Sequence, residues 1–329
     1  MNTTVKSVLI MMASYNGERF ISKQIQSIID QDYKNWHLII QDDGSTDNTI
    51  KIINQFCNKD NRIQLCINNS SYHGPFVNFH LLANTCKKMQ SYDYYMFSDQ
   101  DDLWDSCKIS QLISFIDKYN QGIPILAYSD MRIIDARDQI TCDSMDSIYK
   151  NGNLNRYAVF FAHKIFGCSL IMNCSCFFSA PILDVSNPDV AELSHDNFYA
   201  KIAAVLGNIY YYPETLMGYR RYGDNVSSGQ IYKSNFIRLI KRILNLNAVA
   251  KDQGFIYKKS LYTIRLLQQK ELTKSQKNMI DSIQKIIKNG GIQTISFFKK
   301  HCINLGKKTE NISHIVILLF KLQKKFIDK

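Results

Sequence analysis

The residues best suited to chemistry form one acidic stretch. An apolar run at residues 94–97 ends abruptly in a segment that carries Asp99, Asp101 and Asp102. Such a run predicts a buried strand, and ligand sites in open α/β sheets lie beyond the carboxyl ends of strands. Crowded carboxylates favour a cation such as Mg²⁺ or Mn²⁺ bridging to a diphosphate. The alternative is a solvated acidic loop, or a helix N-cap formed by Asp102 or Asp105.

A second acidic pair follows another apolar run. Asp42 and Asp43 stand between a predicted strand at residues 36–41 and a Gly-Ser turn. At least one of them is expected to point toward the same crevice as Asp99, where it would accept a base N–H or a ribose hydroxyl. An Asx-turn that caps the next helix is the alternative.

The turn at residues 13–17 contains an aromatic residue, Tyr15. Its ring would either stack on a nucleobase or pack against neighbouring side chains. The dinucleotide fingerprint G-x-G-x-x-G and the P-loop pattern G-x-x-x-x-G-K-[ST] are absent from the sequence.

These polar segments are positioned by strands that alternate with amphipathic helices. Strands are predicted at residues 5–12, 36–41, 62–67, 94–97 and 125–130, and helices at 20–29, 46–57, 76–89, 107–119 and 195–206. This alternation predicts right-handed βαβ units in an α/β fold, with a doubly wound, mostly parallel sheet covered on both faces. Residues 135–155 read as irregular, and residues 165–176 contain a further candidate strand.

Composition indicates a globular protein with a large core. The chain has 329 residues, of which 45% are apolar, which suits one large domain or two smaller ones. Nine cysteines without a C-x-x-C pair favour reduced thiols, and the cluster of Cys168, Cys174 and Cys176 lacks the second ligand pair of a zinc site. No signal-like segment and no apolar run of about 18 residues is found, which predicts a cytoplasmic protein.

The positive charge is concentrated at the C-terminal end. Residues 230–329 hold 21 Lys and Arg against 5 Asp and Glu, so the overall net charge of +11 belongs to this region. Apolar residues alternate there with Lys and Arg at helical spacing from Phe236 onward. We therefore predict a catalytic domain at residues 1–229 and a basic, mainly helical region at 230–329. Its helices either lie on an anionic membrane surface or form a packing subdomain whose lysines face water. Nucleic-acid binding is disfavoured because no nucleic-acid module is recognisable.

Three motifs in this order resemble the family 2 glycosyltransferases of GT-A fold. They are Ala13-Ser-Tyr-Asn-Gly, Gln41-Asp-Asp-Gly-Ser-Thr-Asp-Asn-Thr and Ser98-Asp-Gln-Asp-Asp-Leu-Trp. Within that family the chain is most similar to the bacterial rhamnosyltransferase group, through the last of these motifs together with Tyr128-Ser-Asp, Ser194-His-Asp and Tyr219-Arg-Arg-Tyr-Gly-Asp-Asn. The resemblance covers residues 5 to about 228.

The resemblance implies roles for the matching donor-side positions. Ala13, Tyr15 and Asp42 would hold the nucleotide base. Asp99 and Asp101 match a D-x-D pair that positions the ribose and binds the divalent metal, Mn²⁺ or Mg²⁺, on the diphosphate. Asp102 lies beside them in a supporting role at the metal.

Other positions matter for the reaction itself. Asp196 matches the catalytic base of inverting members, with a helix N-cap as the alternative. Arg220 or Arg221 would supply positive charge to the leaving diphosphate, since a planar guanidinium suits phosphate. Tyr222 departs from the family pattern, because related sequences often carry a histidine there, and this departure puts a phosphate or metal contact from that position in doubt.

These roles describe a metal-dependent inverting glycosyltransferase. A carboxylate would take the proton of the acceptor hydroxyl while the nucleoside diphosphate departs from the opposite face of the sugar. The resemblance implies a nucleotide-sugar donor, plausibly dTDP-rhamnose, and a saccharide acceptor that in many such enzymes is linked to a polyprenol. The expected location is the inner face of the plasma membrane, and the expected process is surface-polysaccharide synthesis. The alternatives are a catalytically silent nucleotide-sugar or lipid-binding scaffold, and a nucleotidyltransferase.

Overall fold

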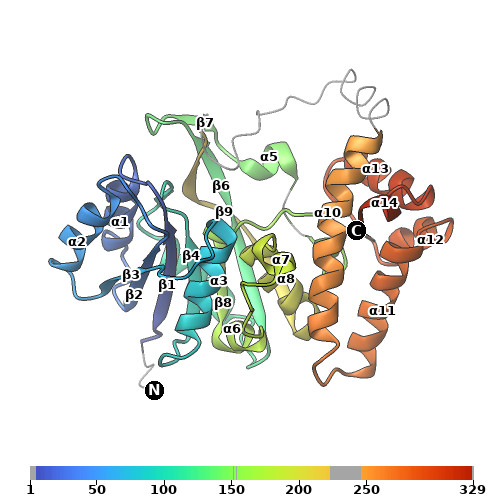
Figure 1. Cartoon of the computed structure of the whole chain (residues 1–329), viewed down its shortest axis with the longest axis horizontal. Helices are drawn as coiled ribbons and strands as arrows, with labels where there is room; N and C mark the ends of the chain where they lie inside the picture. The colour runs from blue at the N-terminus through green and yellow to red at the C-terminus, as the bar shows by residue number, and fades with distance from the viewer. Residues whose placement is uncertain (1–4, 151, 153, 223–245, 328–329) are drawn as a thin grey trace.

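The computed structural model describes residues 5–150, 152, 154–222 and 246–327. The strands in this part of the chain form one sheet in the order β3-β2-β1-β4-β8-β6-β9-β5, with β7 paired to β6 (Figure 1). They are β1 (Val8–Ser14), β2 (Trp36–Asp42), β3 (Ile63–Ile67), β4 (Tyr94–Ser98), β5 (Leu103–Trp104), β6 (Ile125–Ile134), β7 (Ile140–Cys142), β8 (Leu170–Asn173) and β9 (Asn208–Arg220).

The first four strands of this order are parallel and bring the polar motifs to one edge. Ser14 at the end of β1 pairs with Asp42 at the end of β2. On the other side, Met12 pairs with Ser98 at the end of β4. Since parallel strands end at the same edge of the sheet, the two acidic segments predicted to share a crevice emerge side by side.

Helices cover both faces of the sheet, as predicted. On one face, α1 (Ile21–Ile29), α2 (Thr49–Cys57) and α4 (Lys108–Asp117) pack against Val8 and Ile10 of β1. On the other, α3 (Pro75–Cys86) and α8 (His195–Leu206) pack against Leu9 and Met11. Alternate residues of one strand therefore belong to two different cores, and the α/β fold with a doubly wound sheet is confirmed.

The second half of the sheet mixes parallel and antiparallel strands and contains one long strand, β9, that the sequence did not indicate. β8 is antiparallel to both β4 and β6. β9 spans 13 residues and runs parallel to β6, with register shifts near Asp130. The end of β9 pairs with β5, so that Gly218 lies opposite Leu103. This pairing brings the Arg220 segment onto the acidic loop from a distant part of the chain.

Two segments differ from the prediction. The stretch expected to be irregular, residues 135–155, contains β7 and α5 (Met145–Tyr149). The candidate strand at residues 165–176 is divided into the 3-10 helix η2 (Gly167–Ser169), the short strand β8 and the start of α6 (Cys174–Ser179). A second 3-10 helix, η1 (Ala158–Phe160), and the short helix α7 (Pro188–Ala191) complete this part of the chain.

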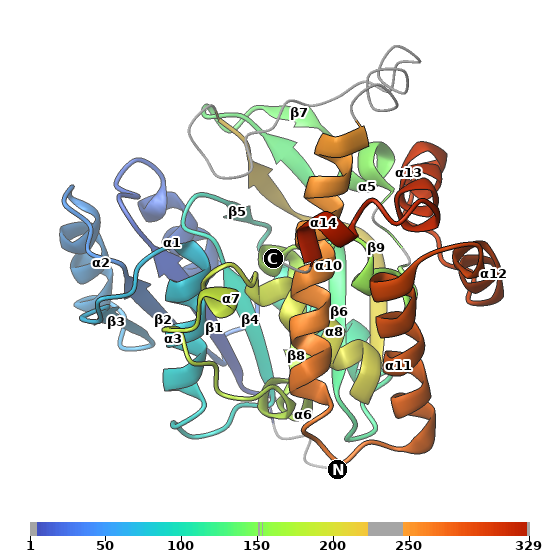
Figure 2. The ribbon, with the colours of Figure 1, turned by 45° about the vertical axis from the view of Figure 1, so that its right-hand side comes forward.

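The C-terminal region is helical, as predicted. It contains α10 (Leu246–Leu267), α11 (Lys274–Asn289), α12 (Gln293–Lys300), α13 (Lys308–Leu319) and α14 (Lys324–Ile327). A reciprocal capping box between Thr273 and Gln276 starts α11. In Figures 1 and 2 these helices, in orange and red, lie together on one side of the molecule, and α10 and α11 contact α8.

The C-terminal helices share a hydrophobic core with the sheet. Tyr257 of α10 and Phe298 of α12 pack around Phe161, with ring centroids 5.9 and 5.1 Å apart. The predicted boundary between residues 229 and 230, and the apolar run from Phe236, lie outside the described residues, so the two-domain division stays a prediction. None of the helices described has both the length and the apolarity needed to cross a bilayer.

Candidate active site

The acidic loop after β4 is fastened to the turn after β1. The side-chain amide of Gln100 accepts the Tyr15 backbone N–H at 2.9 Å and donates to the Tyr15 carbonyl at 2.9 Å. Gly17 packs under the same side chain: a Cβ at Gly17 would lie 2.3 Å from the Gln100 Oε1. Hydrogen bonds thus join the first motif, at residues 13–17, to the third motif, at residues 98–104.

Two of the three acidic side chains converge on a cysteine. Ligand atoms of Asp99, Asp102 and Cys168 lie within 4.8 Å of one another. Burial, with Asp101 and Asp196 nearby, raises the pKa of Asp99 to about 7. Burial and then Asp99 hold the pKa of Asp102 well above its usual range. The cluster is therefore electrostatically strained unless a positive charge joins it.

The described residues supply part of that positive charge. Lys108 is fully buried, its ammonium lies 3.7 Å from the centroid of the Trp104 ring, and it donates to the Cys168 carbonyl at 2.5 Å. Burial lowers the pKa of Lys108 to about 8, although Asp102 and Asp99 act in the opposite direction.

A divalent cation fits the Asp99–Asp102 pair. Asp102 is 1% exposed and accepts the Arg220 backbone N–H at 3.0 Å, but its Oδ2 has no hydrogen-bond partner in the described part of the chain. Carboxylate oxygens suit Mg²⁺ and Mn²⁺, whereas the sulfur of Cys168 is a soft donor that these ions do not prefer. The two carboxylates are therefore the better candidates for ligands, and Cys168 borders the site.

Asp101, the third predicted metal residue, has a different neighbour. Its carboxylate accepts a hydrogen bond from the phenol of Tyr222. The Tyr222 ring packs on Phe20, with centroids 5.0 Å apart. The residue at which the sequence departs from the family pattern therefore contacts one of the acidic residues directly.

The two predicted arginines have different environments. Arg220 is 1% exposed, donates to the Asp101 carbonyl at 2.6 Å and pairs with Asp138 at 2.6 Å. Arg221 is partly exposed and donates to the Tyr149 hydroxyl at 2.7 Å. Arg220 is thus tied to the acidic loop, and Arg221 is the more accessible cation. Contact of either with a diphosphate stays a prediction.

Asp196 lies in the first turn of α8 and is 7% exposed. Its carboxylate accepts the backbone N–H groups of Asn197 at 2.6 Å and Gly167 at 3.1 Å, and it pairs with His163 Nε2 at 3.2 Å. Burial acts to raise the pKa of Asp196, but His163 and these donors hold it well below its usual range. The N-cap position belongs to Ser194, so Asp196 is not the cap.

A short 3-10 helix joins the two halves of the site. In η2, Gly167 donates to Asp196, and the next residue, Cys168, lies against Asp99 and Asp102. Asp196 is also among the charges that raise the pKa of Asp99. Asp196 and Asp99 therefore both lie beside η2, and their roles in transfer stay a prediction. His195, in contrast, is packed between Phe79 and Phe97, with ring centroids 3.8 and 4.5 Å away.

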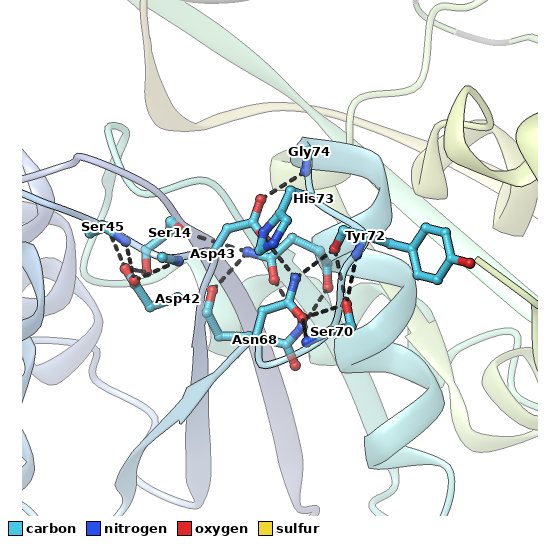
Figure 3. A network of polar contacts seen from close by, with 12 residues as sticks. Ser14, Asp42, Asp43, Ser45, Asn68, Ser70, Tyr72, His73 and Gly74 are labelled. Carbon is cyan, nitrogen blue, oxygen red and sulfur yellow. Dashed lines mark hydrogen bonds and ion pairs between the residues drawn. The ribbon is translucent and has the colours of Figure 1, made fainter. Parts of the chain in front are cut away.

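The residues predicted to hold the nucleotide base belong to a dense polar network at the ends of β1, β2 and β3 (Figure 3). Asp42 is fully buried and accepts Ser14 Oγ at 2.8 Å, together with the Ser45 N–H at 2.7 Å and hydroxyl at 2.6 Å. These are the hydrogen bonds of the Asx-turn alternative. A base contact by Asp42 would require one of them to be exchanged, and that contact stays a prediction.

Asp43 and Tyr15 complete this side of the site. Asp43 accepts Asn68 Nδ2 at 2.6 Å and the Gly74 N–H at 2.7 Å, and pairs with His73 Nδ1 at 3.0 Å (Figure 3). Tyr15 is 55% exposed, so its ring is open to a stacking partner. Ala13 lies opposite Gln41 in the β1–β2 register, one residue before the Ser14–Asp42 pair.

A family model described as glycosyl transferase family 2 matches residues 9–225. This match spans the sheet, the acidic loop and Asp196. The chain belongs to glycosyl transferase family 2. It is accordingly a glycosyltransferase, and the resemblance inferred from the three motifs is confirmed.

Relatives of this family 2 glycosyltransferase include an uncharacterized glycosyltransferase of Haemophilus influenzae, 25% identical over 98% of this chain and 97% of its own. A dTDP-rhamnosyl transferase, RfbG, of Shigella flexneri is 39% identical over 31% of this chain. A UDP-Glc:alpha-D-GlcNAc-diphosphoundecaprenol beta-1,3-glucosyltransferase, WfgD, of Escherichia coli is 37% identical over 34%. The last two are matched over only 35% and 42% of their own length.

Among solved structures, S. aureus TarS 1-349 in complex with UDP-GlcNAc aligns with 96% of this family 2 chain and 80% of its own, with a TM-score of 0.56 and 16% identity. At that identity the likeness shows the fold alone. Together with the observed sheet and helix layers, it confirms the GT-A fold.

Sequence reasoning missed two residues of the glycosyltransferase site. Cys168 was considered only as part of a cysteine cluster, and the structure separates it from that cluster by placing it beside Asp99 and Asp102. His163 was not singled out, because it stands in a segment without a recognisable pattern. Neither contact has a local signal, since both partners are distant in sequence.

Proposed function

We propose that the protein is a metal-dependent inverting glycosyltransferase that moves a sugar from a nucleoside-diphosphate donor to a saccharide acceptor. The observation that carries this proposal is the junction at η2, where Gly167 holds Asp196 and Cys168 adjoins Asp99 and Asp102. The Asp196 carboxylate is ionised and accepts hydrogen bonds from backbone donors, whereas Asp99 and Asp102 form a crowded acidic pair. This contrast suits a base on one side and a cation site on the other.

In the proposed reaction, Asp196 takes the proton of the acceptor hydroxyl as that oxygen bonds to the anomeric carbon. The bond from the anomeric carbon to the diphosphate oxygen breaks at the same time, so the configuration is inverted. The depressed pKa of Asp196 keeps this base ionised at neutral pH. Gly167 and Asn197, which donate to the carboxylate, hold it in a fixed position.

The donor would be bound by residues of the first and third motifs and of the segment that follows β9. Tyr15 is open for stacking on the base, and Arg221 is the accessible cation for the leaving diphosphate. A divalent ion, Mn²⁺ or Mg²⁺, would be held by Asp99 and Asp102, with Asp101 beside them, and would supply charge that stabilises the leaving group. Release of Asp101 from Tyr222 would free a further carboxylate for the donor.

The relatives suggest which substrates to test. The names of the Shigella and Escherichia relatives specify dTDP-rhamnose and UDP-glucose chemistry, and the second also specifies a diphosphoundecaprenol-linked acceptor. We infer a role in cell-surface polysaccharide synthesis, with dTDP-rhamnose as the first donor to test and a polyprenol-linked saccharide as the acceptor.

A lipid-linked acceptor would require the enzyme to work at the inner face of the plasma membrane. Two features of the C-terminal helices support attachment there. Ile292 and Phe320 are 82% and 66% exposed, and the Gly291 N–H donates to the Leu318 carbonyl at 2.9 Å, which brings the two segments together. The neighbouring helices α11 and α12 also carry exposed lysines. Apolar side chains among cations suit an anionic surface.

The proposal is tested by screening nucleotide-sugars for donor hydrolysis and transfer, with and without Mn²⁺. Metal-dependent turnover of at least one donor supports the proposal. Donor binding without any turnover would instead identify a nucleotide-sugar-binding scaffold. Formation of a nucleotide-sugar from a sugar 1-phosphate and a nucleoside triphosphate would identify a nucleotidyltransferase.

A further inference from the structure

A buried guanidinium links the acidic loop to the hairpin formed by β6 and β7. The side chain of Arg220 is fully buried. Its Nε donates to the Asp101 carbonyl at 2.6 Å, and its Nη1 donates to the Asp135 carbonyl at 2.6 Å. The same Nη1 lies 2.6 Å from Asp138 Oδ1. One side chain at the end of β9 therefore contacts both the loop that carries the candidate metal ligands and the turn between β6 and β7.

The turn at residues 135–139 has a shape that its own hydrogen bonds define. The Asp135 carboxylate accepts the backbone N–H groups of Arg137 at 2.7 Å and Gln139 at 2.9 Å. Asp138 has a φ of 65°, a left-handed conformation that aspartate and asparagine adopt more readily than most residues. Local contacts thus fix the two acceptors that the turn offers to Arg220, a carbonyl and a carboxylate.

Asp138 pairs with two cations of different exposure. Its Oδ1 pairs with Arg220, and its Oδ2 pairs with Lys23 of α1. Burial acts to raise the pKa of Asp138, but hydrogen bonds from Lys23 and Arg220 lower it. Lys23 is 57% exposed, whereas the Arg220 side chain is fully buried. Because a buried charge is costly without its partner and an exposed pair contributes little, the pair with Arg220 is the one that matters for the acidic loop.

The contacts at position 220 suit an arginine specifically. The Arg220 backbone N–H donates to Asp102 Oδ1 at 3.0 Å, while the guanidinium donates to the Asp101 carbonyl. The guanidinium also lies 4.4 Å from the centroid of the Phe20 ring. A planar guanidinium can stack on a ring and make several directed hydrogen bonds at once, whereas an ammonium cannot. The acidic loop is therefore held at two successive residues by one residue of β9.

We propose that Asp138 and Arg220 are positioning residues that fix the acidic loop and thereby set its affinity for the divalent cation. Asp138 fixes the guanidinium, the guanidinium holds the Asp101 carbonyl, and the Arg220 N–H holds Asp102. Neither positioning residue has to touch the cation. The proposal rests on the proposed metal dependence, and it gives the turn between β6 and β7 a part in metal binding.

The first test measures the loop itself, in the full-length protein without metal. Hydrogen–deuterium exchange of the backbone at residues 98–104 is compared for wild type, D138N and D143N. Asparagine keeps the left-handed conformation accessible at position 138 and removes only the charge. Asp143 is exposed and follows β7, so D143N is the matched control for loss of one negative charge from the same hairpin.

We expect exchange at residues 98–104 to be about tenfold faster or more in D138N than in wild type, because a local contact of the loop is weakened. Exchange there should be unchanged in D143N. Helix α11, which lies well away from β7 in Figure 1, should exchange alike in all three proteins. Equal exchange of the loop in D138N and wild type would overturn the proposal.

The second test measures the affinity for Mn²⁺ without substrates, from the electron paramagnetic resonance signal of the free ion. We expect Kd to rise about fivefold or more in D138N and in R220K, and to stay within about twofold of wild type in D143N. If Asp138 acts through Arg220, the double variant should bind Mn²⁺ no more weakly than R220K alone. Additive losses would show that Asp138 acts by its charge at a distance, and would refute the route through Arg220.

Transfer assays separate positioning from general damage. With Mn²⁺ far above its Kd, kcat of D138N should return to within about twofold of wild type, because the bound ion restores the order of the loop. A kcat that stays low at saturating metal, together with a lowered melting temperature, would leave the pair with a structural role only and contradict the proposal. If wild type binds no Mn²⁺ with or without donor, the proposed metal dependence has failed, and faster loop exchange in D138N would still support positioning by Asp138.

Discussion

Replacing Asp196 by asparagine keeps the shape of the side chain but removes its charge and its ability to take a proton. General-base catalysis contributes about 10² to 10⁴-fold to a rate, which corresponds to about 3 to 5 kcal/mol of activation free energy. We therefore expect kcat for transfer to fall by about that factor in D196N. Donor binding should stay within about twofold, because Asp99 and Asp102 are unchanged.

The variant also has a structural cost that the contacts define. Both carboxylate oxygens of Asp196 accept hydrogen bonds, from Asn197 N–H at 2.6 Å and Gly167 N–H at 3.1 Å. An asparagine offers one oxygen, so one buried N–H group loses its acceptor, at about 1–3 kcal/mol. Thermal unfolding should show this loss while far-UV circular dichroism remains that of wild type.

The assay is product formation under saturating donor and acceptor, with donor affinity measured by calorimetry on the same preparations. Transfer by D196N within threefold of wild type would refute the role of Asp196 as base. If D196N loses both donor binding and transfer, the substitution acts through the structure of the site instead. S186A is a suitable control, because Ser186 hydrogen-bonds only to the exposed turn at Asp184 in the described structure.

Three further predictions follow from contacts in the same site. Chelation of divalent ions should abolish transfer, and Mn²⁺ at a hundred times its Kd should stabilise wild type by about 2.7 kcal/mol, an effect that thermal shift should not detect in D99N. His163 lowers the pKa of Asp196, so H163Q should raise that pKa, and an NMR titration of the Asp196 carboxyl should have its midpoint at higher pH; an unmoved midpoint would show that the backbone donors alone keep the pKa low. A Cβ at Gly167 would lie 2.2 Å from His195 Nε2, so G167A should destabilise the protein by about 1–3 kcal/mol, and an unchanged melting temperature would show that His195 can move aside.

The first half of the fold was predictable because its pattern is local. Each apolar run from β1 to β4 is flanked by turn residues and followed by a helix with apolar residues at helical spacing. β9 was not predicted, since Asn208–Arg220 mixes tyrosines with a proline and a glutamate. Its pairing with β6 and β5 depends on residues about 80 to 115 positions away, which no sequence window contains.

The candidate site was also only partly predictable, because many of its contacts join residues that are distant in sequence. The acidic residues were identifiable from the sequence because carboxylates at the end of an apolar run are unusual. Their partners were not. Tyr222, Cys168 and His163 each reach the acidic residues through a different element, and each contact exists only after the sheet has assembled.

The packing of the C-terminal helices around Phe161 limits how such an enzyme can diversify. Ser260 of α10 donates to the Phe160 carbonyl at 2.8 Å within the core, and Asn155 donates to the His301 carbonyl at 3.0 Å. A segment joined in this way cannot be exchanged between homologues as an independent cassette. Chimaeras that splice in a foreign C-terminal segment should be recovered mainly as insoluble protein.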